Sequence, residues 1–307
     1  MMAKQPKRRW TGIIALLVAL WLISFVMSMF ITSDLQITSG NVLVIPIKGV
    51  ILGDDPGGFG SNALSSSQVV SDIEAAAEDD DIKAIVFEIN SPGGSAVASD
   101  EIAQAVIALD KPTVSYIREV GASGAYWVAA STDKIFVNRM SITGSIGVIA
   151  SYLQFSDLLD EHGVTYERMV AGKYKDMGTP FKDLSDTERL IFQQTLDQIH
   201  KEFVKGVAEN RNLSVEKVTE LATGQVYLGS RALGLGLVDE IGGKNEVHAY
   251  LEKELNMTVE FFEWERKESI LDLLSQISGG GSYQVGRGIG DSLVKGSVEP
   301  SVPVVWS

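Results

Sequence analysis

Short apolar runs alternate with segments of helical period through the middle of the chain, and this alternation limits the possible folds more than any other feature of the sequence. Runs rich in Val, Ile and Phe have the length expected of buried strands, and they lie at residues 41–51, 84–90, 112–117 and 134–139. Between them, the apolar spacing predicts helices at residues 66–80 and 95–109. Strands separated by helices are typical of βαβ units, so we predict an α/β domain built on a mostly parallel sheet.

Helical periodicity dominates the second half of the chain. The spacing predicts a long amphipathic helix, three shorter helical segments and a last strand, at residues 184–211, 214–224, 230–243, 245–255 and 259–264. After about residue 278 the sequence turns to Gly, Ser and Pro, a composition typical of a flexible tail. We therefore predict a single domain over residues 34–278 and a flexible tail over residues 279–307.

The amino terminus combines a basic cluster with a long uncharged run. Residues 1–9 are rich in Lys and Arg, and residues 10–33 contain no charged side chain. An α-helix needs about 20 apolar residues to cross the hydrocarbon core of a membrane, and this run is longer than the apolar region of a signal peptide. We predict an uncleaved transmembrane anchor over residues 10–33, with residues 1–9 in the cytoplasm and the domain outside it. A signal peptide that is removed is the alternative.

The composition excludes several classes of function. The formal net charge of −14 argues against binding to nucleic acid, because so acidic a chain offers no basic surface to the phosphates. The absence of cysteine excludes disulfides, thiolate nucleophiles and cysteine-based zinc sites. Because the chain has only 3 histidines, well separated in sequence, we expect no metal site.

One serine lies among small residues in the stretch GASGAYWVAAS, residues 121–131. The surrounding pattern places Ser123 at a strand-to-helix junction, where the first amides of the helix lack partners and favour negative charge. Such a position can stabilise an oxyanion, and the glycines on either side, including Gly124, allow a substrate backbone to come close. An ordinary N-cap serine in a small-residue packing site is the alternative.

The sequence SPGG, residues 91–94, follows directly after a predicted buried strand. Pro92 fixes its own φ, while Gly93 and Gly94 free the following amides to point at a ligand. Open α/β sheets bind ligands at the carboxyl ends of their strands, where this predicted turn lies. A plain turn is the alternative, and the spacing matches neither a dinucleotide-binding motif nor a Walker motif.

The histidines do not favour a Ser-His-Asp triad, which needs an imidazole within reach of the serine. His162 precedes a glycine at a predicted helix end, a position that suits the helix dipole. His200 and His248 lie inside predicted helices. None of these positions has the glycine-rich or loop context of a site, so the sequence points away from histidine as the base.

Lysine is the other candidate base. The loop-like segment VAGKYKDMGTPF, residues 170–181, contains Lys175. A lysine acts as a base only when neutral, so its pKa must fall from about 10.4 to roughly 7–8 through burial and neighbouring dipoles. The segment SITGSIGVI offers two hydroxyls that could orient an amine, those of Thr143 and Ser145. A solvated loop lysine is the alternative.

The order and spacing of these segments resemble those of the signal peptide peptidase A family, also called protease IV. The matching segments lie between residue 41 and about residue 250, and they are FEINSPGGSA, GASGAYWVAASTDKIFVN, SITGSIGVI, GKYKDMGTPF and GQVYLGSRALGLGLVDEIGG. The family consists of membrane-bound Ser/Lys proteases, and the length of this chain matches its short form with one catalytic domain. The resemblance therefore implies a ClpP/crotonase-like α/β fold of repeated ββα units with an N-terminal transmembrane helix.

The resemblance also assigns roles to side chains. Ser123 corresponds to the nucleophile of the family, and Lys175 corresponds to the general base. Lys173 is the alternative base if the register of that motif differs. Ser145 corresponds to the serine that orients the lysine amine.

The oxyanion hole of the family maps onto backbone amides of this chain. They are those of Gly93 or Gly94 and of Gly124. The chain has SGAYW where the common form of the family has SGGYY. We expect Ala125 and Trp127 to reshape the substrate pocket and to leave the serine in place.

The function implied is that of a membrane-anchored serine endopeptidase that degrades signal peptides and other membrane-derived peptides after their release. We expect no cofactor, contact with lipid through the N-terminal helix, and a catalytic domain outside the cytoplasm, in the periplasm or at the cell exterior. A homo-oligomer whose neighbours complete the binding groove is also implied. Residues 128–133 and 145–150 should form a pocket for small or apolar side chains.

Other functions remain open at this point. A related membrane protease could serve one dedicated membrane-protein partner. A crotonase-like acyl-CoA enzyme could use the same fold, although it would not need a serine with a distant lysine. A membrane scaffold without catalytic activity is a further alternative.

Overall fold

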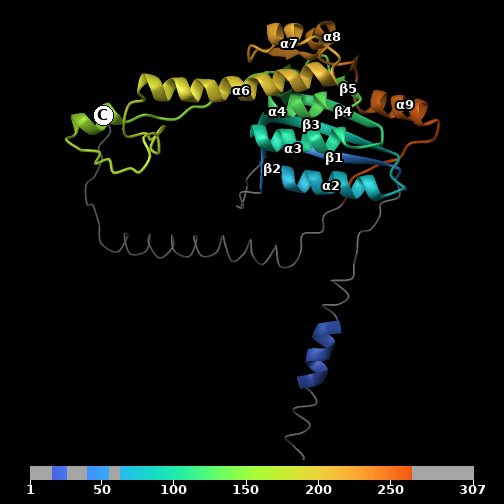
Figure 1. The fold of residues 1–307 in the computed structure, drawn as a ribbon. Helices are drawn as coiled ribbons and strands as arrows, with labels where there is room; N and C mark the ends of the chain where they lie inside the picture. The colour runs from blue at the N-terminus through green and yellow to red at the C-terminus, as the bar shows by residue number, and fades with distance from the viewer. Residues whose placement is uncertain (1–15, 26–39, 55–62, 265–307) are drawn as a thin grey trace, which may run out of the picture.

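The computed structural model describes residues 16–25, 40–54 and 63–264. Its body is a sheet whose strands follow the order β2-β1-β3-β4-β5-β8, each parallel to its neighbour (Figure 1). These strands are β2 (Ala63–Ser65), β1 (Val42–Leu52), β3 (Ala84–Gly94), β4 (Thr113–Ala122), β5 (Lys134–Val137) and β8 (Glu240–Ile241). The predicted α/β class with a mostly parallel sheet is confirmed.

Short strands extend the sheet where the longer ones begin or end. β9 (Phe261–Phe262) pairs with the start of β1. β6 (Ile142–Gly144) pairs with the carboxyl end of β4, and β7 (Val226–Leu228) runs antiparallel to β6. The β6–β7 ribbon therefore lies beside the end of β4, directly before Ser123.

Two hydrophobic cores lie on opposite faces of the sheet. One is covered by α2 (Ser66–Glu78), α3 (Ala96–Ile107) and α4 (Gly124–Ala130), and the other is covered by α9 (Lys244–Leu255). Along β1, Leu43 and Ile45 belong to the first core, whereas Val42 and Val44 belong to the second. Burial on both faces explains why the sequences of these strands are nearly continuous apolar runs.

The long helix α6 (Asp186–Asn210) packs on α4 and extends beyond the sheet (Figure 1). A capping box between Ser185 and Glu188 starts it. The ring of Phe203 stacks on Trp127 with 4.6 Å between centroids, which fixes the carboxyl half of α6 on the body. The helices α7 (Val215–Leu221) and α8 (Gly229–Leu235) follow α6 in the chain.

Residues 149–184, which we call the arm, precede α6 and lie beyond its amino-terminal end, away from the sheet (Figure 1). The arm contains the short helix α5 (Ser156–Glu161), none of whose residues is buried. Large apolar side chains of the arm are exposed, among them Ile149, Leu153 and Met169. A single copy of the chain therefore leaves an apolar surface of the arm uncovered.

Most predicted elements are confirmed, with boundaries that differ by a few residues. The prediction of a turn at SPGG was wrong, because β3 continues as a strand to Gly94. The register of β3 shifts there against both β1 and β4, so the chain changes direction without leaving the sheet.

Residues 128–133 were expected to contribute to the substrate pocket. For residues 128–130 this prediction was wrong. Val128, Ala129 and Ala130 are fully buried in the first core. Ala125 is also fully buried, and Trp127 packs under α6. Neither side chain therefore faces an open pocket, and Trp127 contributes to the packing of α6 on α4 instead.

The structure describes only part of the predicted anchor. Residues 16–25 are helical and lie inside the predicted span of residues 10–33. Among the residues that the structure describes, no helix is long and apolar enough to cross a membrane. Residues 1–9, the remainder of the predicted span and the predicted tail of residues 279–307 lie outside the described residues, so these limits stay predictions.

Candidate active site

Ser123 lies between the end of β4 and the start of α4 with a strained backbone. Its φ is 54° and its ψ is −128°, a combination that L-residues other than glycine seldom adopt. It occupies the N-cap position, but its side chain makes no capping hydrogen bond. Strain of this kind costs about 1–3 kcal/mol and is retained mainly at functional sites. The geometry thus argues against an ordinary N-cap serine.

The backbone around Ser123 is fixed on both sides. Its N–H donates to Gly144 O at 2.8 Å, and its carbonyl accepts from the N–H groups of Tyr126 and Trp127 at 2.9 and 3.0 Å. The Tyr126 hydroxyl donates to Leu237 O at 2.8 Å, and burial raises the pKa of this tyrosine well above its ordinary value. The nucleophile candidate is therefore held by a rigid junction rather than by a loop.

Three predicted oxyanion glycines meet at Ser123. A Cβ added at Gly93 would lie 2.6 Å from Gly124 N and 2.9 Å from Ser123 Cβ. A Cβ added at Gly124 would lie 2.1 Å from Ser99 Oγ and 3.4 Å from Gly94 N. These approaches are possible only because both residues lack side chains. The structure therefore brings Gly93, Gly94 and Gly124 together around the serine, as the sequence predicts.

Ser145 lies beside Ser123 at the end of the neighbouring strand. Ala122 of β4 pairs with Gly144 of β6, and each serine is the next residue along its strand. The N–H of Ser145 donates to Gln225 O at 2.8 Å, while within the described chain its hydroxyl makes no hydrogen bond.

Thr143 carries the other hydroxyl that could orient an amine, but this hydroxyl already makes a hydrogen bond. Its Oγ1 donates to Gly121 O at 2.7 Å, and the side chain is fully buried. Of the two candidates, the structure therefore leaves the Ser145 hydroxyl available beside the nucleophile candidate.

Lys175 lies on the arm, and its side chain is exposed. It belongs to a series of turns in which its N–H donates to Gly172 O at 3.1 Å. The neighbouring Lys173 Nζ lies 5.0 Å from the centroid of the Tyr174 ring. Because the arm lies away from the sheet (Figure 1), one copy of the chain does not bring either lysine to Ser123.

Comparison with known proteins places the chain in a family. The profile of Peptidase family S49 matches residues 107–258, a range that includes Ser123, Ser145 and Lys175. A candidate protease of Methanocaldococcus jannaschii, MJ0651, is 36% identical over 221 residues, which cover 70% of this chain and 70% of that protein. The chain belongs to the signal peptide peptidase A family of S49 peptidases. It is a serine protease.

Two further relatives of this S49 peptidase are longer than this chain. A candidate signal peptide peptidase SppA of Enterococcus faecium is 34% identical over 221 residues, 71% of this chain and 64% of the relative. Protease 4 of Haemophilus influenzae is 30% identical over 261 residues, 81% of this chain but only 42% of the relative. The S49 chain thus spans less than two thirds of these two relatives.

A chain of charged side chains, which sequence reasoning missed, holds the lysine-bearing turns of this S49 peptidase. Arg168 Nε and Nη2 donate to the two carboxylate oxygens of Asp176 at 2.5 and 2.9 Å, and Nη2 also donates to Lys173 O at 2.9 Å. Lys182 Nζ lies 3.4 Å from Asp176 Oδ1 and 2.6 Å from Glu188 Oε1. The network connects the turns around Lys175 to the first turn of α6. The sequence gives no spacing signal for this network, because its partners are 6 to 8 residues apart and all except Glu188 lie in irregular structure.

The network also holds its two carboxyl groups in the charged form. The hydrogen bond from Arg168, assisted by Lys182, lowers the pKa of Asp176 to about 2. Lys182 and the amide and hydroxyl of Ser185 lower the pKa of Glu188 to about 2. Both carboxylates are therefore ionised throughout the neutral range.

The histidines of the S49 chain serve local structure. His162 Nδ1 lies 3.0 Å from Leu158 O of its own helix, and His248 Nε2 lies 2.9 Å from Val259 O. His200 is half-buried on α6, with its Nε2 buried and without a partner among the described residues. That histidine is not the base stays a prediction.

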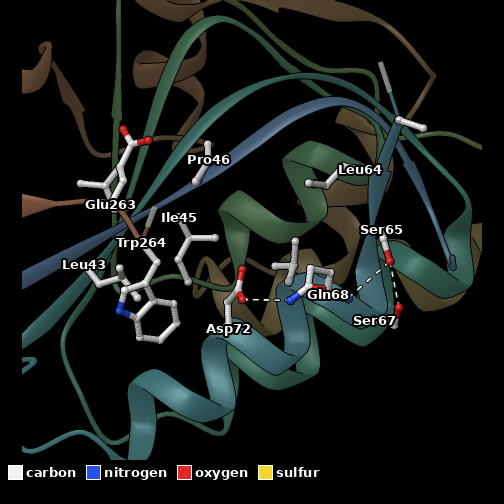
Figure 2. A pocket seen from close by; sticks show the side chains of 13 residues that line it. Leu43, Ile45, Pro46, Leu64, Ser65, Ser67, Gln68, Asp72, Glu263 and Trp264 are labelled. Atoms are coloured by element: carbon white, nitrogen blue, oxygen red, sulfur yellow. Dashed lines mark hydrogen bonds between the residues drawn. The ribbon is translucent and has the colours of Figure 1, made fainter. Parts of the chain in front are cut away.

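A pocket of about 560 Å³ lies away from these residues, between the outer edge of β1 and α2 (Figure 2). Its lining includes Ile45, Pro46, Gln68 and Trp264, and Gln68 Nε2 donates to Asp72 Oδ1 at 3.1 Å. None of the predicted site residues lines it. Because β3 separates β1 from β4, we do not count this pocket as part of the peptidase site.

Proposed function

We propose that Ser123 is the nucleophile of a Ser/Lys endopeptidase and that Lys175 is its general base. The observation that carries the proposal is the strained junction at Ser123, whose hydroxyl makes no hydrogen bond in the described chain and whose Cβ lies close to Gly93. A serine so placed has the amides of a helix start beside it, which suits the negative charge of a tetrahedral intermediate.

The reaction follows from this arrangement. Ser123 Oγ attacks the peptide carbonyl while its proton passes to the neutral amine of Lys175, and the carbonyl oxygen becomes an oxyanion held by the amides of Gly94 or Gly93 and of Gly124. The C–N bond then breaks as the lysine returns the proton to the leaving amine, which leaves an ester on Ser123. Water, deprotonated by the same lysine, hydrolyses this ester. Ser145 would donate or accept the hydrogen bond that orients the Lys175 amine.

Lys175 reaches Ser123, in this proposal, from a second copy of the chain. Support comes from the arm, which carries the lysine away from its own sheet and exposes large apolar side chains (Figure 1). Covering this surface with another copy would remove water from the lysine, and removal of water favours a neutral amine. We therefore propose a homo-oligomer of ClpP/crotonase-like units in which neighbouring copies complete each site.

The proposed substrates are signal peptides and other membrane-derived peptides. The uncharged run of residues 10–33 supports an anchor that keeps the domain near such peptides, with residues 1–9 in the cytoplasm and the domain in the periplasm or at the cell exterior. The Enterococcus faecium relative carries the name of a signal peptide peptidase, which supports the same substrate class. A protease dedicated to one membrane-protein partner would share all these features.

Peptide cleavage by the full-length protein in detergent tests the proposal. Wild-type protein should cleave casein and a synthetic signal peptide, whereas Ser123→Ala and Lys175→Ala should each lose about 10³-fold or more of kcat. Lys175→Arg is the matched control for charge, since arginine stays protonated and cannot act as a base. Full activity of Lys175→Ala would overturn the dyad.

Mixing the two inactive variants tests where the lysine comes from. If the base comes from a neighbouring copy, mixed oligomers of Ser123→Ala and Lys175→Ala contain some sites with both residues and regain part of the activity. No recovery after dissociation and reassembly would contradict a shared site. Comparing the peptides that accumulate in membranes with and without the active enzyme then separates a general signal peptide peptidase from one with a single partner.

A further inference from the structure

Ser91 lies where the sheet changes register next to the catalytic junction. It is fully buried on β3 and pairs with Gly121 of β4. The β3–β4 register shifts between Ile89 and Ser91, and the β1–β3 register shifts between Lys48 and Val50 of β1. Register shifts interrupt ladder hydrogen bonds, so backbone groups at this level need partners from elsewhere.

The Ser91 hydroxyl supplies such partners to two strands. Its Oγ donates to Gly49 O of β1 at 2.6 Å and accepts from Gly93 N–H at 3.1 Å. Gly49 and Gly93 both have positive φ, 81° and 93°, as expected where the chain bends at a register shift. One buried hydroxyl thus connects the irregular part of β1 to the glycine pair beside Ser123.

The hydrogen bond from Gly93 N–H to the Ser91 hydroxyl also determines which glycine amide remains for the proposed nucleophile. Ser95, the residue just after β3, donates its N–H to Ile51 O at 2.8 Å, and Ile51 pairs with Gly94, so positions 93 and 95 face β1. In a parallel ladder the intervening residue directs its N–H to the opposite side. The amide of Gly94 therefore points away from β1, toward Gly124, while the amide of Gly93 is held by Ser91.

We propose that Ser91 is a positioning residue of the peptidase, whose hydroxyl holds Gly93 in the conformation that presents the Gly94 N–H to the oxyanion. The inference rests on the proposed function of Ser123 as the nucleophile. Oxyanion donors are effective because they are fixed before the reaction, so a loosened donor lowers transition-state binding more than substrate binding. Ser91 itself touches neither substrate nor the reacting atoms.

The test compares Ser91→Ala with Ser115→Ala in the full-length protein. Ser115 is the matched control, because it is also fully buried on the sheet and its hydroxyl has no hydrogen-bond partner within the described residues. In Ser91→Ala we expect kcat to fall about 10- to 100-fold, somewhat less than for loss of a whole oxyanion donor. KM should change by less than about twofold, since only transition-state binding is lost.

The inhibition constant of a peptide boronate, which mimics the tetrahedral intermediate, distinguishes a positioning role from a merely structural one. This constant should rise in Ser91→Ala by the same factor as kcat/KM falls, and should not change in Ser115→Ala. Ser91→Thr, which keeps the hydroxyl, should recover activity toward the wild-type level, and it serves as the comparison if Ser91→Ala does not fold.

Two outcomes in a folded Ser91→Ala variant would overturn the inference. One is a kcat in Ser91→Ala within twofold of wild type, and the other is a fall in kcat with unchanged boronate affinity. If Ser91→Ala does not fold and the folded Ser91→Thr shows a boronate affinity that does not follow its kcat/KM, the inference is overturned as well. Failure of the proposed function looks different, because wild-type protein would then neither cleave peptides nor react at Ser123 with a fluorophosphonate.

Discussion

Ser123 and Ser145 occupy equivalent positions at the ends of two neighbouring parallel strands, and both have a positive φ, 54° and 52°. The other non-glycine residues with positive φ in the described chain are Asn212 and Asn256, which lie just after α6 and at the end of α9. Asparagine tolerates this conformation, whereas serine has no such preference. Two strained serines side by side therefore indicate a site maintained for function rather than for stability.

Replacing Ser145 by glycine separates the hydroxyl from the backbone strain. Glycine adopts positive φ freely, so Ser145→Gly should leave the free energy of unfolding unchanged or raise it by up to about 1 kcal/mol. Loss of the hydroxyl, in its proposed role of orienting the base, should nevertheless lower kcat by roughly 10²-fold. Urea unfolding and peptide cleavage on the same preparation check both values.

Ser145→Ala provides the comparison for that prediction. Alanine also lacks the hydroxyl but keeps the strain, so its activity should match that of Ser145→Gly while its stability stays near or below that of wild type. Wild-type activity in Ser145→Gly would show that the hydroxyl has no part in the reaction.

Gly93→Ala should inactivate the peptidase through the space that the added methyl group takes. The Cβ would lie 2.6 Å from Gly124 N and 2.9 Å from Ser123 Cβ, at a φ of 93°. We expect kcat to fall by about 10²-fold or more, as for loss of an oxyanion donor, and the free energy of unfolding to fall by about 1–3 kcal/mol. Gly234→Ala is the control, since nothing lies within 4 Å of its added Cβ and α8 should gain about 0.5–1 kcal/mol. Activity of Gly93→Ala close to wild type would argue against an oxyanion hole at this position.

The parts of the site that could be predicted from sequence are those set by local structure. Ser123 follows a recognisable strand and precedes a helix, and the glycines beside it indicate that another backbone can come close to the serine. The strands of two or three residues, such as β7 and β8, were missed because so short a run has no periodicity. The extension of β3 through SPGG was missed because glycine and proline normally end a strand, and only the register shifts show why they do not.

The place of Lys175 could not be predicted from local structure at all. Its distance from Ser123 depends on how an arm of irregular backbone leaves the sheet and, in the proposed oligomer, on which copy the arm contacts. Trp127 shows a related limit, since it lies close to Ser123 in sequence but its ring packs against Phe203 of α6. Sequence position near the proposed nucleophile therefore does not make a side chain part of the pocket.

Phe203→Ala should loosen α6 from the body. The Phe203 ring is buried and stacked on Trp127 at an interplanar angle of 7°. Removing it should lower the free energy of unfolding by about 3–5 kcal/mol, the range for buried aromatic deletions. Leu190→Ala on the exposed part of the same helix should change it by less than about 0.5 kcal/mol. Urea unfolding measures both, and a loss below 1 kcal/mol in Phe203→Ala would show that the stack does not hold α6.

The arm should be stable at neutral pH and should loosen in acid. Asp176 and Glu188 have pKa values lowered from 3.8 and 4.5 to about 2, through Arg168 and Lys182 respectively. A lowered pKa means that the carboxylate form stabilises the fold, so the contribution is complete above about pH 5 and disappears as the pH falls toward 2. Amide hydrogen exchange between residues 168 and 188, corrected for intrinsic rates, should therefore accelerate below pH 4 before exchange in the sheet does. Asp176→Asn should show fast exchange in the arm at pH 7 and a smaller further change in acid, whereas an arm whose exchange is the same at pH 7 and pH 2.5 would show that these ion pairs do not hold it.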